Sequence, residues 1–342
     1  MRILVGISGG VDSAYAAKKL QMMGHDVEGA ILIMHEYTEL DSAREVAESI
    51  GIVLHEIDCR ERFGCIKENF VNEYTSGRTP NPCIICNERV KFRCLYDFAV
   101  ENGFDKIATG HYAKLVSFNE NDKVRYALEV ADDLKKEQSY MLYRLPQAIL
   151  SNLILPLGDD IKSEIRKNAQ SLGISAADRP DSQEICFLPN GGHTDYIELC
   201  SGKCPEGNFV DENGKIIGKH KGIIHYTVGQ RKGLGISLGE RAFVTDIDPV
   251  TNNITLSPNI SGKASINVSD LVFSGMEPPV SEFNLTLDVK LRYSAKLVKT
   301  TARIFPDGRA VLEFIEPQKC APGQSAVLYK DGRVMCGGFI ER

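Results

Sequence analysis

The sequence predicts a doubly wound α/β domain with a parallel sheet, followed by a small central module and a C-terminal domain that resembles a β-barrel. In the first half, short apolar runs alternate with amphipathic segments of helical period. After about residue 195 the pattern changes to Gly-rich turns and runs of period two. The length of 342 residues also exceeds that of one small domain. We therefore expect domains at 1–195, 196–265 and 266–342.

The first half contains the strands and helices of the α/β domain in alternating order. The expected strands are Arg2 to Ile7, Val27 to Met34, Val53 to Asp58 and Lys106 to Thr109. The expected helices are Asp12 to Met23, one opened by a capping box of Ser42 and Glu45 and ended by Gly51, Cys65 to Thr75, and Phe92 to Asn102. Because a doubly wound sheet binds ligands at the carboxyl ends of its strands, we expect the site at that edge.

The C-terminal part shows the alternation of a sheet with one buried face. Apolar residues at 285, 287, 289, 291 and 293 alternate with polar residues between them. Val311 to Ile315, Ser325 to Tyr329 and Arg333 to Ile340 are further short strands, with Pro-Asp-Gly and Lys-Asp-Gly turns nearby. These strands predict a small barrel or sandwich. Residues 196–262 are irregular and Gly-rich, which predicts a separate module.

Charge is distributed unevenly along the chain, whose net charge is −6. Residues 200–342 carry 18 Lys/Arg and 15 Asp/Glu, a net of +3, so the acidic surplus lies in residues 1–199. One basic cluster consists of Lys290, Arg292, Lys296, Lys299 and Arg303. Such a surface attracts a polyanion, although solvated strand faces explain the charges equally well.

Neither a membrane span nor a secretory signal is expected. No apolar run approaches the roughly 20 residues that a transmembrane helix needs. We therefore expect a soluble, cytoplasmic protein without a membrane partner. In that compartment the ten cysteines are expected to be mostly reduced thiols.

A Gly-rich loop joins the first expected strand to the first expected helix. Its residues are Gly6, Ile7, Ser8, Gly9, Gly10, Val11, Asp12 and Ser13. Glycines allow close approach of an anion, and the free amides at a helix N-terminus favour a phosphate. The Gly-Lys-Ser/Thr of a Walker loop is absent from it, and so is the spacing of a dinucleotide fingerprint. The alternative is a plain tight turn.

Two sets of cysteines have a polar or Pro-rich context. Cys83 and Cys86 follow a Pro-bracketed loop at the expected start of a helix, where a depressed pKa would make them better nucleophiles or metal ligands. A lone Cys-x-x-Cys fits a redox pair, half of a zinc site or coincidence. Cys186 supplies a third thiol far downstream. For Cys200 and Cys204 we favour unpaired thiols over a metal site.

The loop resembles the pyrophosphate-binding loop of the N-type ATP pyrophosphatases, the PP-loop superfamily. This resemblance implies that ATP binds there, that pyrophosphate leaves after attack at the α-phosphate, and that Asp12 helps to organise Mg²⁺. The motifs together are similar to those of the tRNA-specific 2-thiouridylase family. The matching stretches are Gly6 to Ser13, Gly77 to Asn87, Ala108 to Tyr112, Lys136 to Tyr140, Pro180 to Phe187, Thr227 to Gly235, Leu291 to Tyr293 and Ala321 to Gln324.

The resemblance implies roles for individual residues. Cys86 matches the nucleophilic cysteine and Cys186 the cysteine that carries a persulfide. Gly6 to Ser13, Leu32 and Gly110 match the ATP site, with Leu32 against the adenine. Asn81, Pro82 and Cys83 match the loop for the target base. The tRNA-contacting positions are matched by His111, Lys136, Glu137, Gln138, Arg292, Tyr293 and Gln324.

The implied reaction is ATP-dependent 2-thiolation of the wobble uridine of tRNA. Adenylation turns the C2 oxygen into a leaving group, and the persulfide supplies sulfur, with a transient disulfide between Cys86 and Cys186. The implied partners are the anticodon stem-loop of tRNA and a sulfur donor such as a cysteine desulfurase or a sulfur-relay protein.

Cys83 departs from the family, many of whose members have Asp at this position. Cys83, Cys86 and Cys186 are therefore alternative ligands of a [4Fe-4S] cluster. Two other functions remain open: a PP-loop enzyme that adenylates a small metabolite, and a non-catalytic tRNA-binding protein with a thiol switch.

Overall fold

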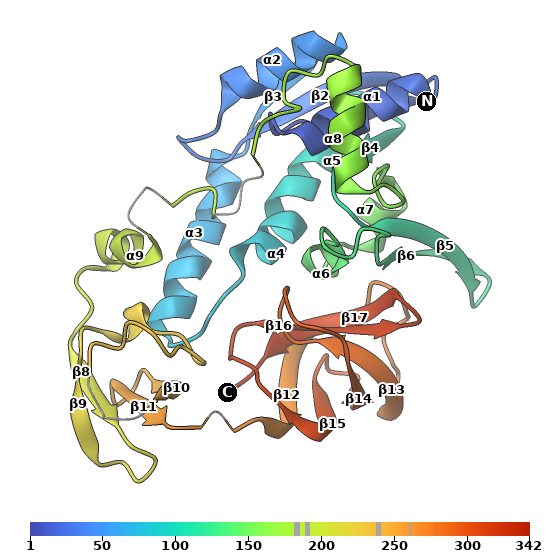
Figure 1. The fold of residues 1–342 in the computed structure, drawn as a ribbon. Coiled ribbons are helices and arrows are strands. Elements are labelled where there is room, and N and C mark those ends of the chain that lie inside the picture. The colour runs from blue at the N-terminus through green and yellow to red at the C-terminus, as the bar shows by residue number, and fades with distance from the viewer. Residues whose placement is uncertain (181–184, 189–191, 237–240, 260) are drawn as a thin grey trace.

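The computed structural model describes residues 1–180, 185–188, 192–236, 241–259 and 261–342. Its N-terminal part is a parallel sheet flanked by helices, its middle part is a small β-module, and its C-terminal part is a β-barrel (Figure 1). The predicted fold class is thereby confirmed. No helix within the described ranges is long and apolar enough to cross a membrane.

The parallel sheet has the strand order β3-β2-β1-β4-β7. Its strands are β1 (Arg2–Gly6), β2 (Asp26–Ile33), β3 (Leu54–Asp58), β4 (Lys106–Ala108) and β7 (Leu153–Ile154). The chain first proceeds from β1 to β2 and later returns to the other side of β1 with β4. This reversal is a topological switch point, where the carboxyl ends of β1 and β4 leave a crevice for a ligand.

The helices around this sheet are amphipathic and bury their apolar faces. They are α1 (Val11–Met22), α2 (Leu40–Ile50), α3 (Arg60–Thr75), α5 (Phe92–Glu101), α6 (Ser139–Leu142), α7 (Gln147–Leu150) and α8 (Lys162–Ser171). The predicted capping box of α2 is wrong. The N-cap is Glu39, whose side chain caps no amide, and Glu45 instead pairs with Arg179. Helix α3 begins earlier than predicted because Phe63 is buried in the core.

The Pro-bracketed loop leads into one helical run of three parts. Helix α4 (Pro82–Cys86) continues as the π-helical turn η1 (Asn87–Lys91) and then as α5. Pro82 occupies the first turn, where its fixed φ suits a helix and its missing N–H costs nothing. Turns of π-helix are frequent at functional sites.

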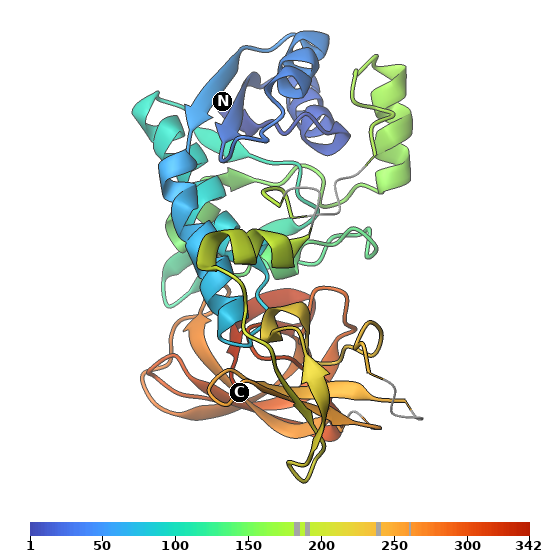
Figure 2. The same cartoon turned by 90° about the vertical axis from the view of Figure 1, so that its left-hand side faces the viewer.

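The central module pairs its strands in the order β10-β11-β8-β9. Its elements are α9 (His193–Ser201), β8 (Gly207–Val210), β9 (Ile216–His220), the 3-10 turn η2 (Ile223–His225), β10 (Phe243–Asp248) and β11 (Asn253–Ser257). Phe209 and Val244 of this module share one apolar cluster with Phe63 and Phe70 of α3. Helix α3 thus connects the sheet to the module, as two views show (Figures 1 and 2).

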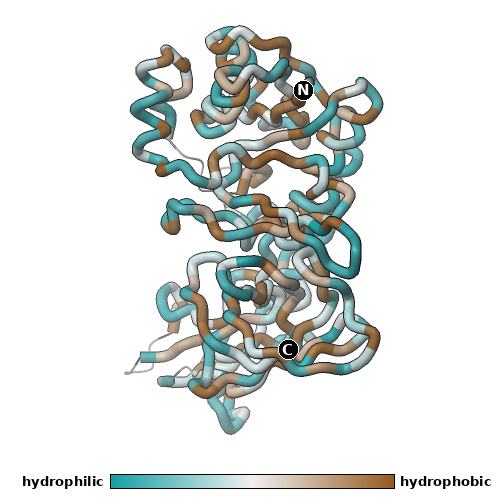
Figure 3. Tube along the Cα trace, turned by 90° about the vertical axis from the view of Figure 1, so that its right-hand side faces the viewer, coloured by the Kyte–Doolittle hydropathy of each residue, from teal (hydrophilic) through white to brown (hydrophobic). Residues whose placement is uncertain are grey.

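The C-terminal strands close into a barrel because β17 pairs with both β16 and β12. They are β12 (Lys263–Val272), β13 (Phe283–Lys290), β14 (Val298–Ile304), β15 (Ala310–Gln318), β16 (Ser325–Lys330) and β17 (Arg333–Ile340). Hydrophobic and hydrophilic segments alternate along this half of the chain (Figure 3). Strand β13 ends at Lys290, so the predicted strand is too long and Arg292 and Tyr293 lie in a turn.

A hairpin that the sequence analysis did not predict lies beside the barrel. It consists of β5 (Lys114–Glu120) and β6 (Lys123–Glu129), and Glu129 pairs with Arg333 of β17. The first half of the chain therefore contributes strands to the C-terminal sheet.

Candidate active site

The Gly-rich loop turns sharply between β1 and α1. Gly9 has φ +78°, and a Cβ atom there would lie 2.8 Å from the Cβ of Ser42. The hydroxyl of Ser13 accepts the backbone N–H of Ser8 at 3.2 Å and donates to the carbonyl of Gly10 at 3.0 Å. Gly10 caps α1 without a side-chain hydrogen bond, and the first amides of a helix favour an anion at its N-terminus.

Gly110, the other predicted ATP-binding glycine, touches this loop directly. It follows β4, and a Cβ atom on it would lie 2.7 Å from the backbone of Asp12 and of Ser13. Only glycine allows this approach, which brings the ends of β1 and β4 together at the switch point. The structure thus joins two segments that were predicted separately.

Asp12 is held by two residues that the sequence analysis did not connect with it. Its carboxylate accepts the ammonium group of Lys162 at 2.6 and 2.7 Å and the hydroxyl of Tyr112 at 2.6 Å. Lys162 opens helix α8, and its side chain is 8% exposed. A buried cation therefore lies beside the loop. No local spacing reveals Lys162, because the pairing depends on how α8 packs against α1.

Arg179 provides a second cation at the loop. Its guanidinium donates to the carbonyl of Gly9 at 2.9 Å and to that of Ser42 at 3.2 Å, and it pairs with Glu45. These contacts fix the turn of the loop against α2.

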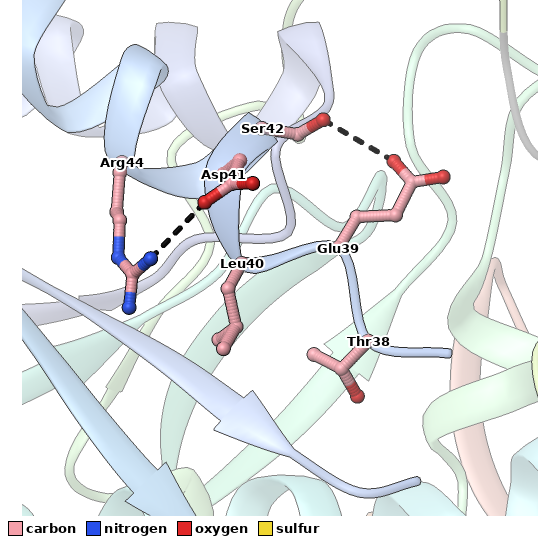
Figure 4. Close-up of a pocket in the computed structure, with 6 residues that line it drawn as sticks. All are labelled: Thr38, Glu39, Leu40, Asp41, Ser42 and Arg44. Atoms are coloured by element: carbon pink, nitrogen blue, oxygen red, sulfur yellow. Dashed lines mark hydrogen bonds and ion pairs between the residues drawn. The ribbon is translucent and has the colours of Figure 1, made fainter. Parts of the chain in front are cut away.

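Leu32 lies near the carboxyl end of β2 and is 9% exposed, in an apolar cluster with Cys59 and Cys86. A pocket of about 410 Å³ opens at the start of α2, close to Gly9. Figure 4 shows its lining, where Ser42 bonds to Glu39 and Arg44 pairs with Asp41. The two acidic residues make this pocket unsuitable for phosphates.

The three candidate thiols belong to two segments. Cys83 and Cys86 lie on α4, and Cys86 is 6% exposed with its sulfur 3.8 Å from that of Met34. Cys186 is exposed and follows residues 181–184 of the predicted motif, which lie outside the described residues. All three are free thiols.

The surroundings of the three thiols disfavour their thiolate forms. Burial, with smaller contributions from the charges of Cys83 and Cys186, raises the pKa of Cys86 to about 12. Burial also raises the pKa of Cys83 and of Cys186, the latter with a contribution from Cys83. The expected depression of the pKa values at the helix N-terminus is therefore wrong, because desolvation of the thiolate outweighs it.

The positive charge of Lys91 opposes the rise in the pKa of the three thiols. It lowers the pKa of Cys83, Cys86 and Cys186, and it also contributes to the low pKa of His111. Lys91 ends the π-helical turn five positions after Cys86. Lys91 was not among the predicted site residues, although its position on the same helical run as Cys86 could have indicated that it lies near the thiols.

His111 is half-buried and neutral at physiological pH. Desolvation, and to a smaller extent Lys91, lower its pKa to about 3. Its Nδ1 lies 2.9 Å from the hydroxyl of Thr109, and its ring packs 5.4 Å from that of Phe92. Through these contacts, His111 helps to fix the segment after β4, which contains Gly110, against the helical run that contains Cys83 and Cys86.

The loop predicted to receive the target base is attached to the barrel. The N–H of Thr79 donates to the carbonyl of Pro322 at 2.8 Å, and the side-chain amide of Gln324 donates to the carbonyl of Thr79 at 2.7 Å. Asn81 contacts the sulfur of Met141 at 3.4 Å, and Pro82 is buried.

The residues expected to contact tRNA differ in accessibility. Arg292 and Tyr293 are exposed, and Lys136 is half-buried. Glu137 is 4% exposed and accepts the ammonium group of Lys290 at 3.0 Å. The side-chain oxygen of Gln138 accepts the N–H of Tyr112 at 2.9 Å. Glu137 and Gln138 therefore hold neighbouring protein groups in this structure.

Metal binding was tested on the donors that are present. Within the part of the chain that the structure describes, no group of three or more His, Cys, Asp or Glu side chains is arranged to hold a metal ion.

Comparison with known proteins follows the same division into parts. Residues 1–190 match the family described as tRNA methyl transferase HUP domain, 195–258 its PRC-barrel domain, and 263–340 the aminomethyltransferase beta-barrel domain. The tRNA-specific 2-thiouridylase MnmA of Treponema denticola is 42% identical over 100% of this chain and 98% of its own length. The protein of the same name from Clostridium perfringens is 40% identical over 99% of this chain and 98% of its own. A solved 4-thiouridine synthetase with RNA and ATP covers 54% of this chain and 44% of its own, with 17% identity and a TM-score of 0.37.

Proposed function

The chain belongs to the tRNA-specific 2-thiouridylase family, and we propose that the loop, thiols and barrel described above perform this family's ATP-dependent reaction on the wobble uridine. It is an enzyme of tRNA modification. The matching domain models are named after methyl transfer, but the relatives along the whole chain are thiouridylases. A phosphate loop together with converging thiols also supports sulfur transfer, since methyl transfer needs neither.

The first step is adenylation of the uracil C2 oxygen. ATP places its phosphates at the N-terminus of α1, the C2 oxygen attacks the α-phosphate, and pyrophosphate leaves. Lys162 lies beside the loop and can exchange Asp12 for a phosphate oxygen. Asp12 would then hold the Mg²⁺ that accompanies ATP and neutralises charge on its phosphates. Leu32 and Gly110 border the adenosine.

The second step transfers sulfur. The exposed Cys186 is accessible to a sulfur donor and carries the persulfide, whereas Cys86 is buried. The terminal persulfide sulfur attacks C2 and AMP leaves. The Cys86 thiolate then attacks the Cys186 sulfur, which frees the thiouridine and leaves a Cys86–Cys186 disulfide, later reduced by two electrons from a thiol reductant. In the other route, Cys86 first releases sulfide from the persulfide.

The tRNA-binding surface would include the exposed turn with Arg292 and Tyr293, the segment from Lys136 to Gln138, His111, and Gln324 near the target-base loop. The wobble uridine flips out of the anticodon loop to reach Asn81, Pro82 and Cys83. A cysteine desulfurase or a sulfur-relay protein in the cytoplasm is the proposed donor. The proposed domain boundaries remain 1–195, 196–265 and 266–342.

Cys83, Cys86 and Cys186 are the ligands of the alternative route through a [4Fe-4S] cluster, and no step is assigned to such a cluster here. We propose the persulfide route. The anaerobic protein is therefore expected to be colourless and free of acid-labile sulfide.

The phosphate loop closed by Gly110, in a chain whose relatives along its whole length are thiouridylases, carries this proposal. The test is anaerobic reconstitution with unmodified tRNA, ATP and a persulfide donor, scored by nucleoside mass. Cys86→Ser and Cys186→Ser should lose 2-thiouridine, while Cys83→Ser should keep appreciable activity. Equal loss of activity in all three variants, together with a brown colour of the wild type, would contradict the persulfide route.

A further inference from the structure

Arg144 lies between the helical run that carries the thiols and the C-terminal barrel. It follows α6 closely, belongs to none of the sequence motifs, and its side chain is only 4% exposed. A buried arginine costs free energy unless each of its donors is satisfied. The partners of Arg144 therefore indicate what it is for.

On one side, Arg144 holds the π-helical turn. Its Nε donates to one carboxylate oxygen of Glu88 at 2.7 Å, and its Nη2 lies 3.2 Å from the other. Glu88 is two residues beyond Cys86. This two-point contact fixes both the distance and the direction of the turn, which a single contact from a lysine would not do.

On the other side, Arg144 holds the barrel at β12. Its Nη1 donates to the backbone carbonyl of Asp270 at 3.0 Å, and its Nη2 donates to the Asp270 carboxylate at 3.0 Å. Asp270 has φ +53°, an uncommon conformation for a residue other than glycine. The guanidinium also lies 5.0 Å from the centre of the Phe339 ring on β17.

Residues near Arg144 also connect the helical run that carries the thiols to the barrel. Asn87 donates to the carbonyl of Met141 at 2.9 Å, and the hydroxyl of Tyr143 lies 3.1 Å from that of Ser325 on β16. Segment 139–144 thus contacts the thiol helix and the barrel along its length. Arg144 is the member of this segment whose single side chain reaches both.

We propose that Arg144 is a positioning residue for sulfur transfer, which keeps the helical turn after Cys86 in register with the barrel that binds tRNA. This inference rests on the proposed function. Adenylation takes place at the loop after β1, whereas sulfur transfer needs the thiols at the activated base. Loss of Arg144 should therefore uncouple the second step from the first.

The test compares two products of one reaction, pyrophosphate and 2-thiouridine, at saturating ATP, tRNA and persulfide donor. For Arg144→Met we expect pyrophosphate release and the KM for tRNA to stay within about twofold, while 2-thiouridine formed per pyrophosphate falls about tenfold. Arg144→Lys should recover only part of the coupling. Arg125→Met removes a half-buried, ion-paired arginine on β6 and should leave the ratio unchanged.

Two further variants keep the test decisive if Arg144→Met folds poorly. Asp270→Gly removes the side chain on the barrel and suits the positive φ of this position, and it should lower the same ratio. In an Arg144→Met/Glu88→Gln double variant the losses should be less than additive, because both changes break one contact. Equal losses of pyrophosphate and 2-thiouridine, or an unchanged ratio in both Arg144→Met and Asp270→Gly, would overturn the inference. A wild type that makes neither product would instead refute the proposed function.

Discussion

The side-chain amide of Gln324 donates a 2.7 Å hydrogen bond to the carbonyl oxygen of Thr79 and so fastens the barrel to the loop that precedes the thiol helix. Pro322 accepts the N–H of the same Thr79 at 2.8 Å. Both backbone polar groups of Thr79, its N–H and its carbonyl, are therefore hydrogen-bonded to the barrel. These two hydrogen bonds fix the position of the loop relative to the barrel.

Gln324→Ala should weaken this attachment. Loss of one hydrogen bond costs about 1 kcal/mol, which corresponds to roughly fivefold in kcat/KM for tRNA. Steady-state 2-thiouridine formation measures the effect. Gln318→Ala, a half-buried glutamine on the same barrel that bonds only to a neighbouring carbonyl, is the control and should retain full activity. Equal values for both variants would show that the Thr79 contact is not needed.

The strands and helices of the first domain follow from local periodicity, since β1, β2 and α1 fall within a residue or two of their predicted bounds. The hairpin β5–β6 was missed although it is local, with a turn at Asn121 and Asp122 that both have positive φ. Its pairing with β17, some 200 residues later, could not be read from the local sequence. Periodicity within a segment carries no information about such a pairing.

The features of the candidate site also fall into two groups, those that the local sequence predicts and those that depend on tertiary packing. Loop glycines and cysteines are visible in the sequence because their chemistry depends on residue type and local spacing. The pairing of Asp12 with Lys162 and the burial of Cys86 depend on how distant elements pack. The pKa of Cys86 was therefore predicted in the wrong direction.

Gly110→Ala should abolish ATP binding. The added methyl group would lie 2.7 Å from the backbone of Asp12 and Ser13, and backbone atoms cannot move aside without distorting the phosphate loop. Isothermal titration with ATP, and pyrophosphate release, measure the loss, which we expect to exceed a hundredfold. Gly64→Ala on α3 meets nothing within 4 Å and should bind ATP normally with slightly higher stability. Normal ATP affinity of Gly110→Ala would mean that the loop binds no nucleotide.

Cys94 should be alkylated before Cys86 although the two are 7% and 6% exposed. A hydrogen bond from Cys59 and the Arg62 guanidinium, 3.9 Å from the sulfur, lower the pKa of Cys94 to about 7, whereas burial raises that of Cys86 to about 12. Since only the thiolate reacts, raising the pH from 7 to 9 should accelerate Cys86 about a hundredfold and Cys94 about twofold. Iodoacetamide labelling with peptide mass mapping measures both rates.

Arg62→Met is the matched variant for this experiment. Without the guanidinium the pKa of Cys94 rises, so its labelling at pH 7 should slow while that of Cys86 stays the same. Faster labelling of Cys86 than of Cys94 at pH 7 would contradict the assignment of these environments.

Lys162→Met should remove pyrophosphate release almost completely. Lys162 is a buried cation that opens α8 and contacts both carboxylate oxygens of Asp12, the acidic residue of the phosphate loop. Without it, Asp12 keeps a negative charge beside the site of the ATP phosphates, and repulsion replaces attraction in a partly desolvated setting. We expect at least a hundredfold loss of tRNA-dependent pyrophosphate release, with a higher KM for ATP. Lys167→Met, an exposed lysine on the same helix, is the control.

The Lys162→Met/Asp12→Asn double variant separates two causes of the loss. If repulsion by Asp12 dominates, the double variant should bind ATP better than Lys162→Met alone. If Lys162 acts by contacting a phosphate, the double variant should bind ATP no better. Full activity of Lys162→Met would show that the ion pair only supports the fold.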